Sequence, residues 1–178
     1  MRPQPDFPAC VAATSYAGVP RRVLLAYKDQ GRRAMGSVLA AQLLSAVRAA
    51  ADGMPAAHAL GLVPIPTAPA ARRRRGGDHL IPILRTARRR SRNLFGVWPL
   101  LRTTHERADS VGLDAAARRR NIADGFAIRV WARRPPESTA LLLVDDVVTS
   151  GATLAEAART LRAAGFPVLG SVALAATP

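Results

Sequence analysis

The chain has 178 residues, and 49% of them are hydrophobic, so it is long enough for one ordinary domain with a full core. It carries 26 Lys and Arg against 12 Asp and Glu, a formal charge of +14 that suits phosphate-rich partners such as nucleic acid or phosphorylated metabolites. The competing interpretation is that these arginines only cover solvated faces.

Cysteine content and hydropathy limit the class of protein further. Cys10 is the only cysteine, which excludes an internal disulfide and a multi-cysteine zinc site and fits a reducing cytosol. No uninterrupted apolar stretch approaches the roughly 20 residues of a membrane span. We therefore expect a cytoplasmic protein with no zinc and no membrane partner. Aromatic residues make up 4% of the chain, too few to predict a stacking platform for single-stranded nucleic acid.

The first part of the chain predicts helices after an irregular start. Residues 1–19 are Pro-rich and aperiodic, and we interpret them as a lead-in to a domain over 20–178. Pro20 suits the first turn of a helix over 21–28, and Gly31 interrupts that helix. A second helix over 32–50 has an almost entirely apolar face at 3.6-residue spacing, made of Met35, Val38, Leu39, Gln42, Leu43, Ala46, Val47 and Ala50.

In the middle of the chain, apolar runs alternate with segments that contain Pro and Gly. A buried strand is expected over 58–66, with the loop 66–78 carrying Arg72 to Arg75. The further expected elements are a helix over 79–90, a short strand over 96–101, a loop over 103–113, a helix over 115–123 capped by Asp114, and a strand over 126–131.

The last forty residues form the clearest unit. An apolar strand over 141–144, a helix from about 153 to 164 and a strand over 168–175 predict a βαβ unit. Such units build a mostly parallel sheet flanked by helices, an α/β fold in which ligands bind outside the carboxyl ends of the strands.

The stretch "LLLVDDVVTSGAT", residues 141–153, places two acids where this buried strand ends. Asp145 and Asp146 can accept hydrogen bonds from ribose hydroxyls or bind Mg²⁺ directly or through water. The small residues after them allow the backbone to close around a phosphate at the N-terminus of the helix. The alternative is an ordinary strand-to-helix turn with Thr153 as its N-cap.

These residues resemble the phosphoribosyl-pyrophosphate signature of type I phosphoribosyltransferases. Three further stretches resemble the ComF competence-protein family, a branch of these enzymes: "LLAYKDQGRR", "LVPIPTAPAARRRRGG" and "VGLDAAARRRNIADGF". Together the resemblance covers about residues 16–175. It implies a type I phosphoribosyltransferase-like fold, the substrate phosphoribosyl pyrophosphate and the cofactor Mg²⁺.

The resemblance also implies roles for individual residues. Asp145 and Asp146 would bind the ribose hydroxyls, and the pyrophosphate turn would include Pro66, Arg74 and Arg75. The rest of the signature would surround the 5′-phosphate: Val147, Val148, Thr149, Ser150, Gly151, Ala152 and Thr153. A solvated charge run or a general nucleic-acid patch is the other interpretation of Arg72 to Arg75.

Two catalytic candidates, Lys28 and Arg118, lie outside the signature. Lys28, the only lysine, matches the lysine of the family's "YK" motif, although an exposed ammonium on the first helix explains it equally. Residues 111–126 resemble the segment that includes a mobile flap in related transferases, with Arg118, Arg119 and Asn121 at matching positions. A closed flap would exclude water from the reacting sugar.

The chain departs from the family after its pyrophosphate turn. Gly77, Asp78 and His79 stand where the family commonly has Phe, Asn and Gln. His58, His79 and His105 show no ligand spacing, so we predict no metal or catalytic role for them. The segment with four cysteines that many members carry is also absent.

Two functions are therefore predicted. The first is a phosphoribosyltransferase that uses Mg²⁺ and phosphoribosyl pyrophosphate on an unidentified nitrogenous acceptor. The alternative is a non-catalytic ComF-type accessory protein that binds DNA during uptake. The sequence predicts neither the acceptor nor the oligomeric state, and a homodimer is compatible with either function.

Overall fold

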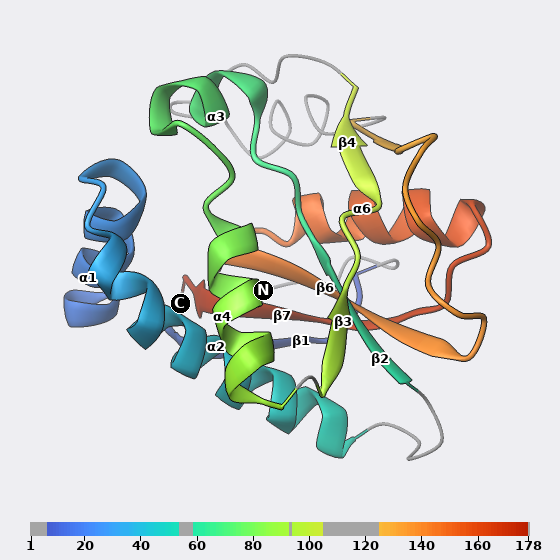
Figure 1. The fold of residues 1–178 in the computed structure, drawn as a ribbon, viewed down its shortest axis with the longest axis horizontal. Helices are drawn as coiled ribbons and strands as arrows, with labels where there is room; N and C mark the ends of the chain where they lie inside the picture. Colours follow the sequence, from blue (N-terminus) through green and yellow to red (C-terminus); the bar gives the residue numbers. More distant parts are fainter. Residues whose placement is uncertain (1–6, 54–58, 93, 105–124, 178) are drawn as a thin grey trace.

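A five-stranded parallel sheet forms the centre of the molecule (Figure 1). The computed structural model describes residues 7–53, 59–92, 94–104 and 125–177. The strand order is β1-β7-β6-β2-β3, and every neighbouring pair is parallel. The bounds are Cys10–Ser15 for β1, Ala59–Pro64 for β2, Phe95–Val97 for β3, Thr139–Val148 for β6 and Val168–Ala176 for β7.

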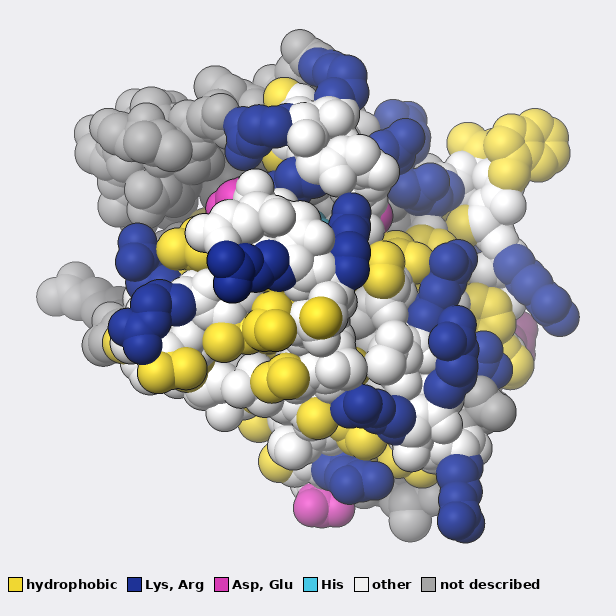
Figure 2. Space-filling view, turned by 60° about the vertical axis from the view of Figure 1, so that its left-hand side comes forward, with side chains coloured by type: hydrophobic (Ala, Val, Ile, Leu, Met, Phe, Trp, Pro, Cys, Tyr) yellow, Lys and Arg dark blue, Asp and Glu magenta, His cyan; other side chains and the backbone are white. Residues whose placement is uncertain are grey.

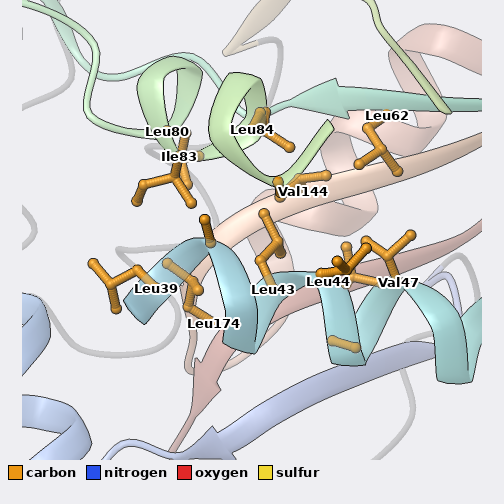
Figure 3. Close-up of a cluster of buried hydrophobic side chains, with 14 of the residues drawn as sticks. Leu39, Leu43, Leu44, Val47, Leu62, Leu80, Ile83, Leu84, Val144 and Leu174 are labelled. Carbon is orange, nitrogen blue, oxygen red and sulfur yellow. The ribbon is translucent and has the colours of Figure 1, made fainter. Parts of the chain in front are cut away.

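Helices cover both faces of this sheet. On one face α1 (Gly18–Asp29), α2 (Gly36–Asp52) and α4 (Leu80–Arg90) share a hydrophobic core with the strands (Figure 3). On the other face α6 (Ala152–Ala163) packs in a second core together with residues of a small antiparallel sheet, β4 (Leu101–Thr103) and β5 (Phe126–Ile128). The predicted α/β class with a mostly parallel, helix-flanked sheet is thus confirmed, as is the βαβ unit β6-α6-β7.

Strand β6 is the central element because its aliphatic residues serve both cores. Successive side chains of a strand point to opposite faces. Leu141 and Leu143 accordingly pack in the α6 core, whereas Leu142 and Val144 pack in the core beneath α2 and α4. Each fully buried leucine contributes about 1.5–3 kcal/mol by leaving water. The uninterrupted apolar run from Leu141 to Val144 is therefore typical of a strand that is buried on both faces.

Three sequence predictions are wrong in detail. The lead-in over 1–19 is not irregular throughout, because Cys10–Ser15 forms β1 and pairs with β7. The loop over 66–78 contains the short helix α3 (Pro69–Arg75), whose proline lies in the first turn, where a missing amide hydrogen is tolerated. The single strand over 96–101 is in fact two strands, β3 and β4, that belong to different sheets.

Helix α2 belongs to the core. The stretch Arg33–Asp52, which includes the 3₁₀ turn Arg33–Met35, is long and apolar enough to cross a membrane by length and composition alone. However, Leu39, Leu43 and Val47 are buried in the core shared with α4 and the sheet. Its apolar face is thus largely as predicted, although Val38 is exposed.

The two halves of the sheet diverge between β2 and β6. The connection from β2 leads through α3 and α4 to β3, and α4 lies on one face. The connection from β6 leads through α6, on the opposite face, to β7. Because β2 and β6 are neighbours, a crevice opens at their carboxyl ends, which is where ligands bind in open α/β sheets.

Candidate active site

Asp146 lies at this crevice and binds two cationic or potentially cationic side chains. It is 9% exposed and lies near the end of β6, on the face covered by α1 and α4. The Nζ atom of Lys28, from the last turn of α1, is 2.5 Å from its Oδ2 atom. The Nε2 atom of His79, just before α4, contacts the same oxygen. The Lys28 side chain is 16% exposed, so the interpretation as an exposed ammonium is wrong.

The ionised form of Asp146 is strongly favoured. Burial by itself raises the pKa of the Asp146 carboxyl. The hydrogen bond with His79 and the positive charge of Lys28 lower it by more, so the pKa lies well below its usual value. Asp146 is therefore a buried carboxylate whose charge is balanced by its neighbours rather than by solvent.

This balance predicts a loss of stability in acid. In the unfolded chain an aspartate has a pKa of about 3.9, above the folded value, so the stabilisation is complete above about pH 4 and is lost as the pH falls further. We expect the melting temperature of the wild type to fall more steeply between about pH 4 and pH 2 than that of Asp146→Asn. Thermal unfolding followed by circular dichroism measures both slopes, and equal slopes would show that Asp146 is not linked to folding.

His79 is held in place by neighbours from three segments. Its Nδ1 atom lies 3.1 Å from the Thr67 hydroxyl, in the turn after β2. The Tyr27 hydroxyl donates a hydrogen bond to the His79 carbonyl, at 3.2 Å. Asp78 accepts a hydrogen bond from the amide of Leu80 at 2.9 Å and so caps the start of α4. Asp78 and His79 are therefore structural parts of this site.

No metal or catalytic role was predicted for His79, and its contact with Asp146 was not foreseen. The side chain lies 67 positions from Asp146 in the chain, and no spacing rule connects the two. One sequence signal did exist: an Asp-His pair between the arginine run and an amphipathic helix suits a helix cap. That signal places His79 at the beginning of α4, and only the sheet topology then places it beside β6.

Lys28 also lines a cavity that two of the predicted pyrophosphate residues share. This cavity, about 550 Å³ in volume, is lined by Tyr27, Lys28, Asp29, Gly31, Arg33, Arg74 and Arg75. Arg75 is paired with Asp29 at 3.0 Å, whereas Arg74 is exposed. The structure thus places Lys28, which contacts Asp146, in the same cavity as Arg74 and Arg75.

A second, smaller cavity lies on the Thr67 side of His79. It has a volume of about 280 Å³ and is lined mainly by basic and hydroxyl side chains: Pro66, Thr67, Pro69, Arg72, Arg73, Asp78, Arg102, Thr103 and Arg129. The predicted pyrophosphate residue Pro66 is therefore near Arg72 and Arg73 but lines a different cavity from Arg74 and Arg75. Helix α3 separates the arginine run in this way because successive residues of a helix point in different directions.

Asp145 does not share the surroundings of Asp146. The pleat of β6 points its side chain toward the α6 face, where its negative charge contributes to a raised pKa of Cys10, after the larger effect of burial. Its Oδ1 atom accepts a hydrogen bond from the Asp146 amide at 2.8 Å. Val147 and Val148 continue the strand and pack in the two cores. Of the signature acids, only Asp146 faces Lys28 and His79.

The small residues after β6 make a tight turn into α6. Gly151 has a φ of 74°, a left-handed conformation that glycine adopts without strain. A Cβ at Gly151 would also lie 2.4 Å from the Phe7 ring. Helix α6 begins at Ala152, so Thr153 lies inside its first turn and is not the N-cap. Thr149 is exposed and Ser150 half-buried, so the loop is open to solvent.

The predicted flap residues and the predicted metal site remain to be placed. Arg118, Arg119, Asn121, His58 and His105 lie outside the described residues, as does the helix predicted over 115–123. Within the described ranges, no group of three or more His, Cys, Asp or Glu side chains is placed to hold a metal ion.

Comparison with known proteins adds no further constraint on the site. No protein-family model matches the chain, and no curated protein matches it.

Proposed function

We propose that this chain is a phosphoribosyltransferase of the type I class, which binds phosphoribosyl pyrophosphate with Mg²⁺ at the crevice between β2 and β6. One observation supports the proposal: the buried carboxylate Asp146 contacts Lys28, which lines the same cavity as Arg74 and Arg75 of α3. The resemblance of residues 141–153 to the family signature agrees with this position. The type I fold assignment is part of the proposal.

Asp146 would hold the ribose. An ionised carboxylate accepts hydrogen bonds from two neighbouring hydroxyls, and Asp146 is strongly ionised. Lys28 now donates to Oδ2, so the incoming sugar would replace this contact and release the ammonium toward the phosphate groups. The turn Thr149 to Gly151 and the first amides of α6 would bind the 5′-phosphate at the positive end of the helix.

The arginines would stabilise the leaving group. In the reaction the bond between ribose C1 and the pyrophosphate oxygen breaks, a bond from C1 to the acceptor nitrogen forms, and the acceptor loses a proton to solvent. Negative charge therefore develops on the pyrophosphate. Arg74 and Arg75 on one cavity, and Arg72 and Arg73 on the other, lie where they can bind these oxygens. A Mg²⁺ ion bound to the pyrophosphate would supply further positive charge.

Release of pyrophosphate tests this function. We expect the wild type to release pyrophosphate from phosphoribosyl pyrophosphate with Mg²⁺ and at least one base from a panel of purines, pyrimidines and simple amines. Asp146→Asn should reduce the rate on the order of a hundredfold, since it removes a fixed charge at the reacting sugar. Asp52→Asn makes the same change at an exposed position on α2 and should have no effect. Absence of release with every acceptor would refute the catalytic part.

The charge distribution favours DNA binding as the second candidate. Figure 2 shows many Lys and Arg side chains scattered over the described part of one face, with few acidic side chains between them. Such a surface attracts a phosphate backbone without reading its sequence. We expect this function to show DNA affinity that falls steeply with salt and is unchanged in Asp146→Asn. DNA affinity that is absent at low salt would exclude it.

A further inference from the structure

A third cavity, with a volume of about 800 Å³, lies at the β3 edge of the main sheet. It is formed by the C-terminal part of α4, the chain from β3 to β4, and the turn after β5. Its volume is that of a typical small-molecule site, about 300–1,000 Å³. Asp146, Lys28 and His79 do not line this cavity, which shares Arg102 and Arg129 with the smaller cavity beside Thr67.

The polar side chains of this cavity are all cationic. Among the described residues no carboxylate lines it. Four arginines do: Arg88, Arg102, Arg129 and Arg133. They come from three separate segments of the chain, so their convergence is a property of the fold and not of one basic run. Arginine presents a planar fork of donors that matches the oxygens of a phosphate. The cavity is therefore suited to an anion.

Two aromatic rings complete the cavity. Trp131 is 96% exposed and is next to Val130, which is also exposed, so a large apolar surface faces solvent here. The turn that carries both residues is anchored, because the Ala132 amide donates to the Arg129 carbonyl at 3.1 Å and the Arg129 side chain donates to the Leu101 carbonyl at 2.8 Å. An exposed tryptophan on an anchored turn offers a flat surface for a ring to stack on.

The second ring forms a fixed wall. The Trp98 amide donates to the Leu62 carbonyl of β2 at 2.8 Å. The indole lies against two strand glycines, since a Cβ at Gly96 would be 2.4 Å from Nε1 and a Cβ at Gly61 would be 3.0 Å from Cδ1. Glycine at both positions is what allows the ring to lie flat on the sheet edge.

We propose that this cavity binds a free mononucleotide, with the base stacked on Trp131 and the phosphate among the arginines. Aromatic stacking and arginine forks are the two elements that together recognise a base and its phosphate. A strand of nucleic acid is less well matched, because strand-binding grooves offer successive rings, whereas Trp131 is the one exposed ring here. Of this cavity and the smaller one beside Thr67, only this one is lined by Trp131 and Arg88, so variants at these positions separate the nucleotide site from the proposed transferase site.

Calorimetric titration of adenosine 5′-monophosphate into the full chain tests this site. We expect saturable binding, weaker on the order of tenfold in Trp131→Ala and in Arg88→Ser. Both positions are exposed, so the variants should fold. Arg85→Ser removes an exposed arginine one turn earlier on α4, outside the cavity, and should bind as the wild type does. Because both tryptophans of the chain line this cavity, quenching of tryptophan emission should follow the same curve.

Further ligands and variants separate the possible causes of binding. Adenosine and inorganic phosphate should each bind at least about tenfold more weakly than the nucleotide, because each satisfies only half of the site. Binding should persist in Asp146→Asn and Arg74→Ser, which alter the proposed transferase site. The proposal would be overturned by nucleotide affinity that is lost in Asp146→Asn, by affinity unchanged in both cavity variants, or by binding of an oligonucleotide alone.

Discussion

Asp146→Ala should lower the free energy of unfolding at neutral pH by about 3 kcal/mol, because it leaves Lys28 and His79 near each other without their shared anion. This is the lower end of the range for breaking a buried ion pair. The three side chains keep between 8 and 16% exposure, so water can partly replace the carboxylate. Chemical denaturation followed by circular dichroism measures the change.

A double-mutant cycle isolates the pair with Lys28. The loss caused by Asp146→Ala should be smaller in a Lys28→Met background, with a coupling energy of about 1–3 kcal/mol. Asp29→Ala is the matched control, since it breaks the more exposed pair with Arg75 and should cost under about 1 kcal/mol. If Asp146→Ala costs no more than Asp29→Ala, the cluster does not have the buried, charge-balanced character described above.

Gly61→Ala should destabilise the sheet because three packed side chains surround this position. A Cβ at Gly61 would lie 2.6 Å from a Leu141 methyl group, 2.8 Å from the Thr139 methyl group and 3.0 Å from the Trp98 ring. All three neighbours lie on or beside the packed strands, so the added carbon forces them apart, at a cost of about 1–3 kcal/mol. Because Trp98 must move, the emission spectrum of tryptophan should change together with the stability.

Gly53→Ala provides the comparison for this substitution. The nearest atom to a Cβ at Gly53, which follows α2, is the Ala50 carbonyl oxygen at 3.9 Å, and the φ of Gly53 is −89°. This change should alter stability by less than about 0.5 kcal/mol and leave the tryptophan emission as it is. Equal effects at the two glycines would contradict the close packing of β2, β6 and Trp98.

The βαβ unit was predictable because its signals are local. The aliphatic run before Asp145, the small residues around Gly151 and the periodic helix after them each fall within a few positions. The same holds for the apolar face of α2. Strand β1 was missed for the opposite reason. Its residues, Cys10–Ser15, are mostly small, and its hydrogen bonds reach β7, which is more than 150 positions away in the chain.

Lys28 and Asp146 were predictable as site residues, but His79 and the arrangement of the three were not. The signature pointed to Asp145 and Asp146 as a pair, yet the pleat of β6 gives them different neighbours. Lys28, His79 and Asp146 come from α1, the start of α4 and β6, and no sequence spacing relates them. Their meeting depends on the strand order, in particular on β2 and β6 being neighbours.

Calorimetric titration of phosphoribosyl pyrophosphate with Mg²⁺ tests the central claim, that the crevice built on Asp146 binds this substrate. The account predicts binding that requires Mg²⁺, is abolished by Asp146→Asn, is weakened about tenfold by Arg74→Ser, and is unchanged in Asp52→Asn. Because Arg74 is exposed, the Arg74→Ser variant should fold. It therefore tests the site even if Asp146→Asn is unstable. No binding at millimolar ligand, or binding that survives both Asp146→Asn and Arg74→Ser, would contradict the account.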